Sequence, residues 1–258
     1  MLIQIFLVNL ILLLAYMSIW FLVAYERKRL DTVDTAWGLG FVVVAWSVYA
    51  QQPSTRSLMI AVLVSIWGVR LAYHIWRRSQ RHSNDDPRYT ELSSHWKGNY
   101  WVRAYYSIFL LQGALIMMAS LPIVMAAGEL INGRTWLTWL GLIIWLFGFI
   151  FEAIADQQLA EYLQLKNKPK VVQPGLWRYS RHPNYFGELV QWWAIGIIAL
   201  QVWFGWVGLF GPLILSYLII FVSGIPPIEK RRVKDPEYKA YQLQTSALIP
   251  LPPTKSKV

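Results

Sequence analysis

Long apolar runs fill most of the sequence, and they restrict the chain to a helical fold within a membrane. A bilayer core needs about 20 mainly apolar residues per helix. Five runs meet or approach this length: residues 2–24, 35–49, 58–76, 104–127 and 136–154. One more run, residues 185–224, is long enough for two helices that join near residues 201–204. The sequence therefore predicts an all-α, polytopic membrane protein with about seven transmembrane helices, as a single domain over residues 1–258.

The positions of lysine and arginine predict the orientation of these helices, because cytoplasmic loops carry an excess of both residues. Of the 24 lysines and arginines, 21 lie in the first, third and fifth loops and in the C-terminal tail. The alternate loops hold only Arg56 and Arg134. This pattern predicts an N-terminus outside the cytoplasm and a C-terminus inside it. It also explains the net charge of +10 by attraction to anionic lipids, so membrane lipids and not nucleic acid are the expected partners.

The composition supports this fold class and excludes several kinds of functional site. Hydrophobic residues make up 56% and charged residues 15% of the chain, whereas roughly a quarter of the residues in a soluble protein are charged. The absence of cysteine excludes disulfides, thiolate catalysis, zinc–thiolate sites and iron–sulfur clusters, and no metal site is predicted. No positive segment precedes the first apolar run, so we expect it to stay as a helix and not to be cleaved as a signal peptide.

Polar side chains within the apolar runs are the first candidates for a site, because burying charge in a membrane is costly. In the third run, one helix face carries Arg70, Tyr73, His74 and Arg77. His74 and Arg77 also fit an interfacial role, in which their polar ends reach toward water. Asp31 and Asp34 lie at the start of the second run, where they fit either helix capping or the binding of a substrate or cofactor.

The densest polar segment, residues 173–188, leads directly into an apolar helix. Pro183 fits the first turn of that helix, where proline is tolerated. Three basic residues flank this helix N-terminus: Arg178, Arg181 and His182. A helix N-terminus with such neighbours favours phosphate or another anion.

Asn184 and Glu188 are four residues apart and share one face at the start of the same helix. An interfacial anchor of basic and aromatic residues is the structural alternative for this region, but it does not explain these two residues. Near the C-terminus, residues 228–241 are typical of an amphipathic, basic segment on an anionic membrane.

Two of these segments also carry a resemblance to a known family. Residues 181–188, Arg-His-Pro-Asn-Tyr-Phe-Gly-Glu, together with Glu229 and residues 238–241, resemble the steroid 5-alpha-reductase superfamily. The resemblance is strongest to its bacterial branch of uncharacterised multi-span, DUF1295-like proteins. Further signatures of that branch lie at residues 37–41, 67–71 and 86–89, so the likeness covers nearly the whole chain. It implies an integral protein of the bacterial inner membrane.

The resemblance also implies a cofactor and a set of site residues. Reductases of this superfamily hold NADPH in a cytoplasm-facing cavity among seven helices, and a lipid-like substrate enters from the membrane. Carried over by position, the cofactor-binding residues are Asp156, Arg178, Tyr179, Arg181, His182, Asn184, Tyr185, Glu188, Glu229, Arg231, Arg232 and Tyr241. Steroid reductases use a Glu–Tyr pair toward the substrate carbonyl, but this chain has no glutamate inside its first three predicted spans. Asp34 and Tyr73 are the expected catalytic substitutes.

The resemblance therefore predicts an NADPH-dependent reductase that acts on the C=C bond of a steroid-like or other lipid enone. No Gly-x-Gly-x-x-Gly element is present, so a Rossmann domain is not the expected cofactor site. The Arg-His-Pro element is shared with S-adenosylmethionine-dependent isoprenylcysteine and phospholipid methyltransferases, which is the alternative enzyme class. A membrane carrier is the third possibility, because carriers also contain broken helices and buried charge.

Overall fold

Helices make up the regular structure of the protein in the computed structural model, which describes residues 1–80, 85–167, 169, 171–173 and 175–254. Two isolated β-bridges accompany them, and these described residues form no strand. The chain divides into two compact units. Unit 1 contains residues 1–132 and 199–210, and unit 2 contains residues 133–198 and 211–258. Neither unit is one continuous stretch, and the prediction of a single domain stays a prediction.

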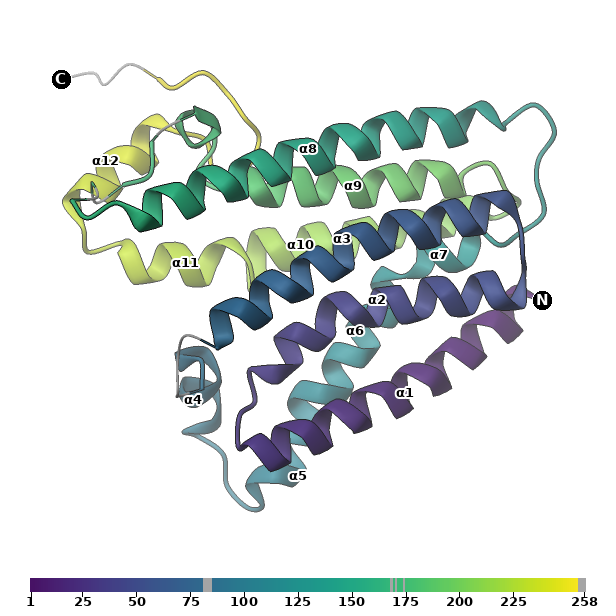
Figure 1. The fold of residues 1–258 in the computed structure, drawn as a ribbon, viewed down its shortest axis with the longest axis horizontal. Coiled ribbons are helices and arrows are strands. Elements are labelled where there is room, and N and C mark those ends of the chain that lie inside the picture. The colour runs from purple at the N-terminus through teal and green to yellow at the C-terminus, as the bar shows by residue number, and fades with distance from the viewer. Residues whose placement is uncertain (81–84, 168, 170, 174, 255–258) are drawn as a thin grey trace. The chain divides into compact units, whose positions relative to one another are not determined.

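Unit 1 is built on three long helices, α1 (Leu2–Arg27), α2 (Thr32–Gln51) and α3 (Thr55–Ser79). Figure 1 shows α2 between α1 and α3. A short helix, α4 (Pro87–Ser93), follows α3, and a fourth long helical segment consists of α5 (Tyr100–Ala104), the π-helical η1 (Tyr105–Leu110) and α6 (Leu111–Ala119). The unit is completed by α7 (Leu121–Met125), which packs against the 3-10 helix η3 (Gly205–Leu209).

Close backbone contact between α2 and α3 holds the centre of unit 1 together. A Cβ atom built on Gly68 would lie 2.6 Å from the carbonyl oxygen of Gly38, and one built on Gly38 would lie 2.8 Å from the carbonyl oxygen of Gly68. Small residues permit such an approach of two membrane helices. At the start of α3, Ser54 and Ser57 form a capping box.

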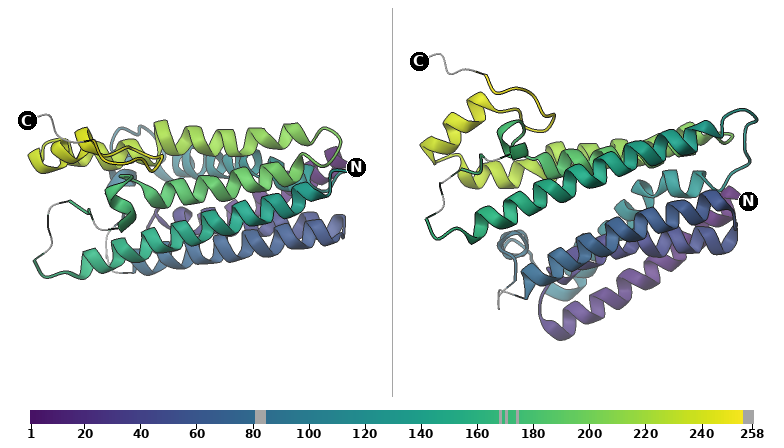
Figure 2. Two further views of the ribbon diagram at one scale, coloured as in Figure 1. Left: turned by 90° about the horizontal axis from the view of Figure 1, so that it is seen from above. Right: turned by 45° about the horizontal axis from the view of Figure 1, so that its top comes forward.

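Unit 2 begins with the longest helix, α8 (Trp136–Gln164), and continues through η2 (Gly175–Arg178) to α9 (Pro183–Ala199). Both views of Figure 2 show α8 beside α9, and Gly148 on α8 meets the Gly187 backbone on α9. The last part of the chain forms α10 (Phe210–Tyr217), the π-helical η4 (Leu218–Val222), α11 (Ile225–Arg232) and α12 (Pro236–Gln244).

The helices confirm the predicted class of an all-α, polytopic membrane protein. Among the residues that the structure describes, six helical segments are long and apolar enough to cross a membrane: Leu2–Arg27, Thr32–Gln51, Thr55–Ser79, Tyr100–Ala119, Trp136–Gln164 and Gly205–Arg232. The remaining predicted span forms α9, whose 17 residues lie at the lower limit for a bilayer. The predicted break near residues 201–204 is confirmed, because α9 ends at Ala199 and η3 begins at Gly205. The orientation of the helices stays a prediction.

Candidate functional site

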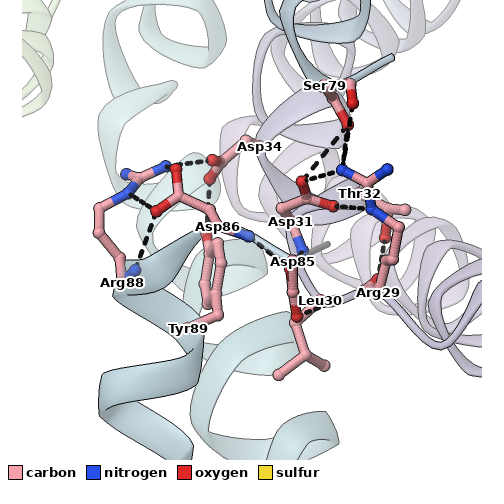
Figure 3. Close-up of polar contacts among 10 residues, drawn as sticks. All are labelled: Arg29, Leu30, Asp31, Thr32, Asp34, Ser79, Asp85, Asp86, Arg88 and Tyr89. Carbon is pink, nitrogen blue, oxygen red and sulfur yellow. Dashed lines mark hydrogen bonds and ion pairs between the residues drawn. The ribbon is translucent and has the colours of Figure 1, made fainter. Parts of the chain in front are cut away.

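A cluster of charged and hydroxyl groups joins the start of α2 to α4 in unit 1 (Figure 3). We call Asp34, Asp86, Arg88 and Tyr89 the Asp34 cluster. Tyr89 Oη donates a hydrogen bond of 2.5 Å to Asp34 Oδ1, and Arg88 Nη2 donates one of 2.5 Å to Asp34 Oδ2. Arg88 also forms an ion pair of 3.0 Å with Asp86. Both oxygens of Asp34 therefore have a strong donor, and the carboxylate is fixed in position.

The electrostatics of the Asp34 cluster keep Arg88 charged and Tyr89 neutral. Burial opposes the charge on Arg88, but the carboxylates of Asp34 and Asp86 outweigh it and raise the pKa of the guanidinium. Burial, and then the charge of Asp34, raises the pKa of Tyr89 well above its ordinary value. Gln112 on α6 donates a longer hydrogen bond, 3.4 Å, to the same tyrosine hydroxyl. Tyr89 is thus a protonated hydroxyl group held between a carboxylate and an amide.

A second set of contacts fixes the backbone beside this cluster. Asp31 occupies the N-cap position of α2, but its side chain makes no capping bond. It accepts hydrogen bonds from Arg29 at 2.6 and 3.1 Å and from Ser79 at 3.3 Å. The Asp85 carboxylate accepts the backbone N–H groups of Leu30 and Asp31, both at 2.9 Å. Helix capping by Asp31 is therefore wrong, and these residues instead tie the α1–α2 turn to the segment after α3.

The structure places Tyr73 away from the partner expected for it. Tyr73 is 53% exposed on α3, and its ring lies against His74 and Trp76. The tyrosine that Asp34 contacts is Tyr89. Sequence reasoning noted residues 86–89 as a family signature, but it did not assign Tyr89 to the site. The sequence motif therefore marked Tyr89, but it could not show that Tyr89 contacts Asp34.

Unit 2 contains the second candidate region, at the start of α9. We call Arg181, His182, Glu229 and Gln242 the Arg181 cluster. Glu229 on α11 accepts hydrogen bonds from Arg181 Nε at 2.8 Å and from Gln242 Nε2 at 3.0 Å, and His182 Nε2 lies 3.2 Å from the same carboxylate. Arg181 Nη1 also donates to the carbonyl oxygens of Gln242 and Thr245 at 3.1 and 2.6 Å. Arg181 therefore holds the last turn of α12 and the residue that follows it, in addition to its ion pair.

His182 is neutral and firmly packed within this cluster. Burial lowers its pKa, although the hydrogen bond to Glu229 opposes that effect. Its ring stacks on Tyr185 with 5.7 Å between the ring centroids. Its backbone N–H donates to Ser180 Oγ at 3.1 Å, just before Pro183 begins α9 as the sequence predicts.

The other predicted cofactor residues occupy different environments. Arg178, Tyr179 and Arg231 are exposed. Arg232 lies over the ring of Tyr238, and the hydroxyl of Tyr241 donates to the carbonyl oxygen of Trp177. The half-buried residues of this set are Asp156, Asn184, Tyr185 and Glu188. The structure thus brings together Arg181, His182 and Glu229, and it gives Tyr241 a structural hydrogen bond.

Sequence reasoning missed a buried polar pair between α8 and α9. Glu152 is 3% exposed and accepts a hydrogen bond of 2.6 Å from Gln191, which is 1% exposed. Gln191 also donates to the carbonyl oxygen of Gly187 at 3.2 Å. The sequence signal was a polar residue inside each of two apolar runs, which is rare enough in a membrane helix to mark a candidate position.

Comparison with known proteins finds one family match that spans the residues of both clusters. The sequence model of a family described as "Protein of unknown function (DUF1295)" matches residues 20–245. An uncharacterised protein of the fission yeast Schizosaccharomyces pombe is 27% identical over 266 residues, which cover 90% of this chain and 74% of the yeast protein. No solved structure matches the chain. The matched region contains all members of the Asp34 cluster and of the Arg181 cluster.

Proposed function

The chain belongs to the DUF1295 family, which is related to steroid 5-alpha-reductase-like proteins, and on this premise we propose that it is a membrane-embedded reductase. The proposed reaction reduces the C=C bond of a steroid-like or other lipid enone, with NADPH as cofactor. The hydrogen bond between Tyr89 and Asp34 carries the proposal, because such a reduction needs a proton donor as well as a hydride. NADPH, when bound, supplies the hydride.

Tyr89 is the proposed proton donor. Its raised pKa keeps the hydroxyl protonated at neutral pH. As the enone is reduced, negative charge develops on its carbonyl oxygen. The Tyr89 hydroxyl turns its hydrogen from Asp34 to that oxygen, and its O–H bond breaks to form an enol. The enol becomes the saturated ketone by losing the proton on oxygen and gaining one at the α-carbon. The guanidinium of Arg88, with Cζ 5.5 Å from the ring centroid, stabilises the tyrosinate until water returns a proton.

Asp34 acts in this proposal through Tyr89. Its Oδ1 atom holds the Tyr89 hydroxyl in place until the substrate oxygen takes over that hydrogen bond, and Arg88 holds Asp34 in turn. Asp34 is therefore a positioning residue, whereas Tyr89 replaces Tyr73 as the proposed catalytic tyrosine. Contacts between a reacting group and its supporting residues hold that group in its productive geometry.

Residues of unit 2 suit the chemistry of NADPH. Asn184 is half-buried, and its side-chain amide has no hydrogen-bond partner in the described part of the chain, so it is available to the nicotinamide carboxamide. The exposed guanidinium groups of Arg178 and Arg231 suit phosphate oxygens, which they can meet with paired N–H donors. Arg181 fits this role less well, because its Nε and Nη1 atoms are committed to protein acceptors. The other predicted cofactor contacts remain predictions.

The proposal is tested by cofactor titration and single-turnover reduction with the purified protein in lipid nanodiscs. We expect tighter binding of NADPH than of NADH, because the extra phosphate gains charge-assisted contacts. Tyr89→Phe should keep NADPH affinity and slow reduction of a steroid enone by roughly a hundredfold or more. The matched control, Tyr73→Phe, should reduce the substrate at the rate of the unaltered protein. A slow Tyr73→Phe beside a normal Tyr89→Phe would return the proton donor to Tyr73.

The same titration distinguishes the alternative functions. Tight binding of S-adenosylmethionine without a response to NADPH would replace the reductase by a methyltransferase, which shares the Arg-His-Pro element of residues 181–183. A protein that binds neither nucleotide would favour the carrier. The chain is membrane-embedded, and the bacterial inner membrane remains its predicted location.

A further inference from the structure

An aromatic groove lies on unit 1 and shares no lining residue with the Asp34 cluster. It has a volume of about 500 Å³ and is lined by residues at the end of α1 and along α5 and η1: Phe21, Leu22, Tyr25, Asn99, Trp101, Val102, Tyr105 and Tyr106. This volume falls within the range of roughly 300 to 1,000 Å³ that is usual for small-molecule sites. Its side chains are mostly apolar, so an acyl chain suits the groove better than a polar metabolite does.

The floor of the groove is rigid. The Phe21 ring packs on Tyr105 and Trp101, with ring centroids 5.0 and 6.3 Å apart, and Tyr25 packs on Trp101 at 4.9 Å. The hydroxyl groups of Tyr105 and Ser18 lie 2.9 Å apart and fix the tyrosine. Tyr105 begins the π-helical turn η1, and such turns are frequent at functional sites. The groove is therefore a formed feature of unit 1.

The outer wall of the groove faces away from the protein core. Leu22 and Val102 are 58% and 52% exposed, and both belong to segments long and apolar enough to cross a membrane. The groove is thus open on the side where lipid lies. Trp and Tyr residues of this kind gather at the boundary between acyl chains and headgroups.

Basic residues lie beside lining residues in both segments. Lys28 comes three residues after Tyr25 and Arg103 four residues after Asn99, so each lies one turn from a residue that lines the groove. Arg27, two residues after Tyr25, lies on another face of α1. These three cations are exposed and form no ion pair in the described parts of the chain. Glu26 is the acidic residue within the same stretch of α1. Lys28 and Arg103 therefore add positive charge next to the apolar lining, and we call these two residues the basic rim of the groove.

Asn99 supplies a hydrogen-bond donor between the basic residues and the apolar interior of the groove. Its side-chain oxygen caps α5 by accepting the N–H groups of Trp101 and Val102 at 3.0 and 3.1 Å. Its Nδ2 group has no acceptor among the residues that the structure describes and is free to meet an ester or phosphate oxygen.

From this arrangement we infer that the groove binds one anionic phospholipid, with an acyl chain against Phe21 and Trp101 and the phosphate near Asn99, Lys28 and Arg103. The match of charge selects the lipid class. An anionic headgroup is attracted to the basic rim and binds more tightly. A zwitterionic headgroup also carries a cation, which the basic rim repels. This binding site is independent of the proposed reductase activity.

The test is native mass spectrometry of the detergent-solubilised full chain, titrated with phosphatidylglycerol or with phosphatidylcholine of the same acyl chains. We expect one molecule of phosphatidylglycerol to bind more tightly than phosphatidylcholine. Lys28→Gln and Arg103→Gln should each weaken that binding by roughly fivefold. Val102→Trp, which fills the groove from an exposed position, should abolish the preference for the anionic lipid, and Leu22→Trp serves the same purpose if Val102→Trp does not fold.

A matched control lies in the basic segment at the other end of the chain. Lys230→Gln with Lys234→Gln removes two exposed positive charges far along the sequence and should leave the tightly bound phosphatidylglycerol in place. Equal affinity for the two lipids in the unaltered protein would overturn the inference. So would a loss of binding in the control that equals the loss in the groove variants, or normal binding in both groove-filling variants.

Discussion

Tyr89 donates its hydroxyl hydrogen to Asp34 over 2.5 Å, although 55 residues separate the two in sequence. This contact joins the first turn of α2 to the short helix α4. Arg88, next to Tyr89 in sequence, donates a hydrogen bond to the other carboxylate oxygen of Asp34. A carboxylate held by two donors from one short helix determines where that helix lies, so the contact serves stability as well as the proposed chemistry.

Asp34→Asn should therefore destabilise the folded protein. The amide retains one acceptor oxygen but loses the charge that pairs with Arg88, so we expect a loss of about 1.5 to 3 kcal/mol. Because the Arg88 side chain is 35% exposed, water limits the loss to the lower part of this range. Thermal unfolding in detergent measures it. Glu91→Gln, an exposed change on the same helix α4, is the control and should unfold at the original temperature.

Glu229→Gln should loosen the end of unit 2. It removes the charge that Arg181 contacts at 2.8 Å and the acceptor that faces His182 at 3.2 Å. We expect a decrease of about 1.5 to 3 kcal/mol in the free energy of unfolding, together with earlier proteolysis after α12. Limited proteolysis followed by mass spectrometry locates the cut. Glu26→Gln, exposed in unit 1, should change neither result, and an intact C-terminal segment in Glu229→Gln would contradict the role of this ion pair.

His182 predicts a loss of stability in mild acid. Burial lowers its pKa in the folded state, with Arg181 and Arg232 acting in the same direction and Glu229 against it. The unfolded chain therefore takes up a proton first, below about pH 6.5, and the stability due to neutral His182 decreases from there through the folded-state pKa. Melting temperatures between pH 7.5 and pH 5 should fall less steeply in His182→Gln. Parallel curves for the two proteins would show that His182 does not contribute.

The sequence predicted the helices well because each long apolar run is a local signal. The start of α9 at Pro183 and the break before Gly205 also have local causes. Proline fits a first helical turn, and Gly205 approaches the Ala199 backbone so closely that an added Cβ would lie 1.9 Å from its carbonyl oxygen. In contrast, α8 extends to Gln164, beyond the predicted end at residue 154, because its last turns are polar and carry no hydropathy signal.

The candidate sites were predictable in residue type but not in pairing. Sequence reasoning named Asp34, Arg181 and Glu229, and it could not determine that Tyr89 rather than Tyr73 meets Asp34. Tyr73 has the helical spacing of a site residue, yet its position on α3 leaves it 53% exposed. Long-range contacts such as Arg181 with Glu229, 48 residues apart, arise from tertiary packing, which no local pattern specifies.

Gly68→Ala should separate α2 from α3. The new methyl group would lie 2.6 Å from the Gly38 carbonyl oxygen and 2.8 Å from a Val42 methyl group, and a backbone atom cannot move aside as a flexible side chain does. Overpacking of this kind costs about 1 to 3 kcal/mol, which thermal unfolding detects. Val69→Ala changes the neighbouring position, which is 53% exposed, and should have little effect. Equal melting of Gly68→Ala and the unaltered protein would show that the helices separate freely at this point.

The orientation of the helices can be tested with reporter fusions placed in successive loops. Cytoplasmic loops retain the excess of lysine and arginine, and 21 of the 24 such residues lie on one predicted side. Fusions after Arg29, Arg88 and Thr254 should therefore report the cytoplasm, and fusions after Pro53 and Gly133 should report the opposite side. The fusion after Gly133 is the most informative, because it follows the fourth long helical segment and precedes α8. A cytoplasmic signal there would reverse the assignment for unit 2 and place the Arg181 cluster outside the compartment that contains NADPH, which would also remove the proposed cofactor.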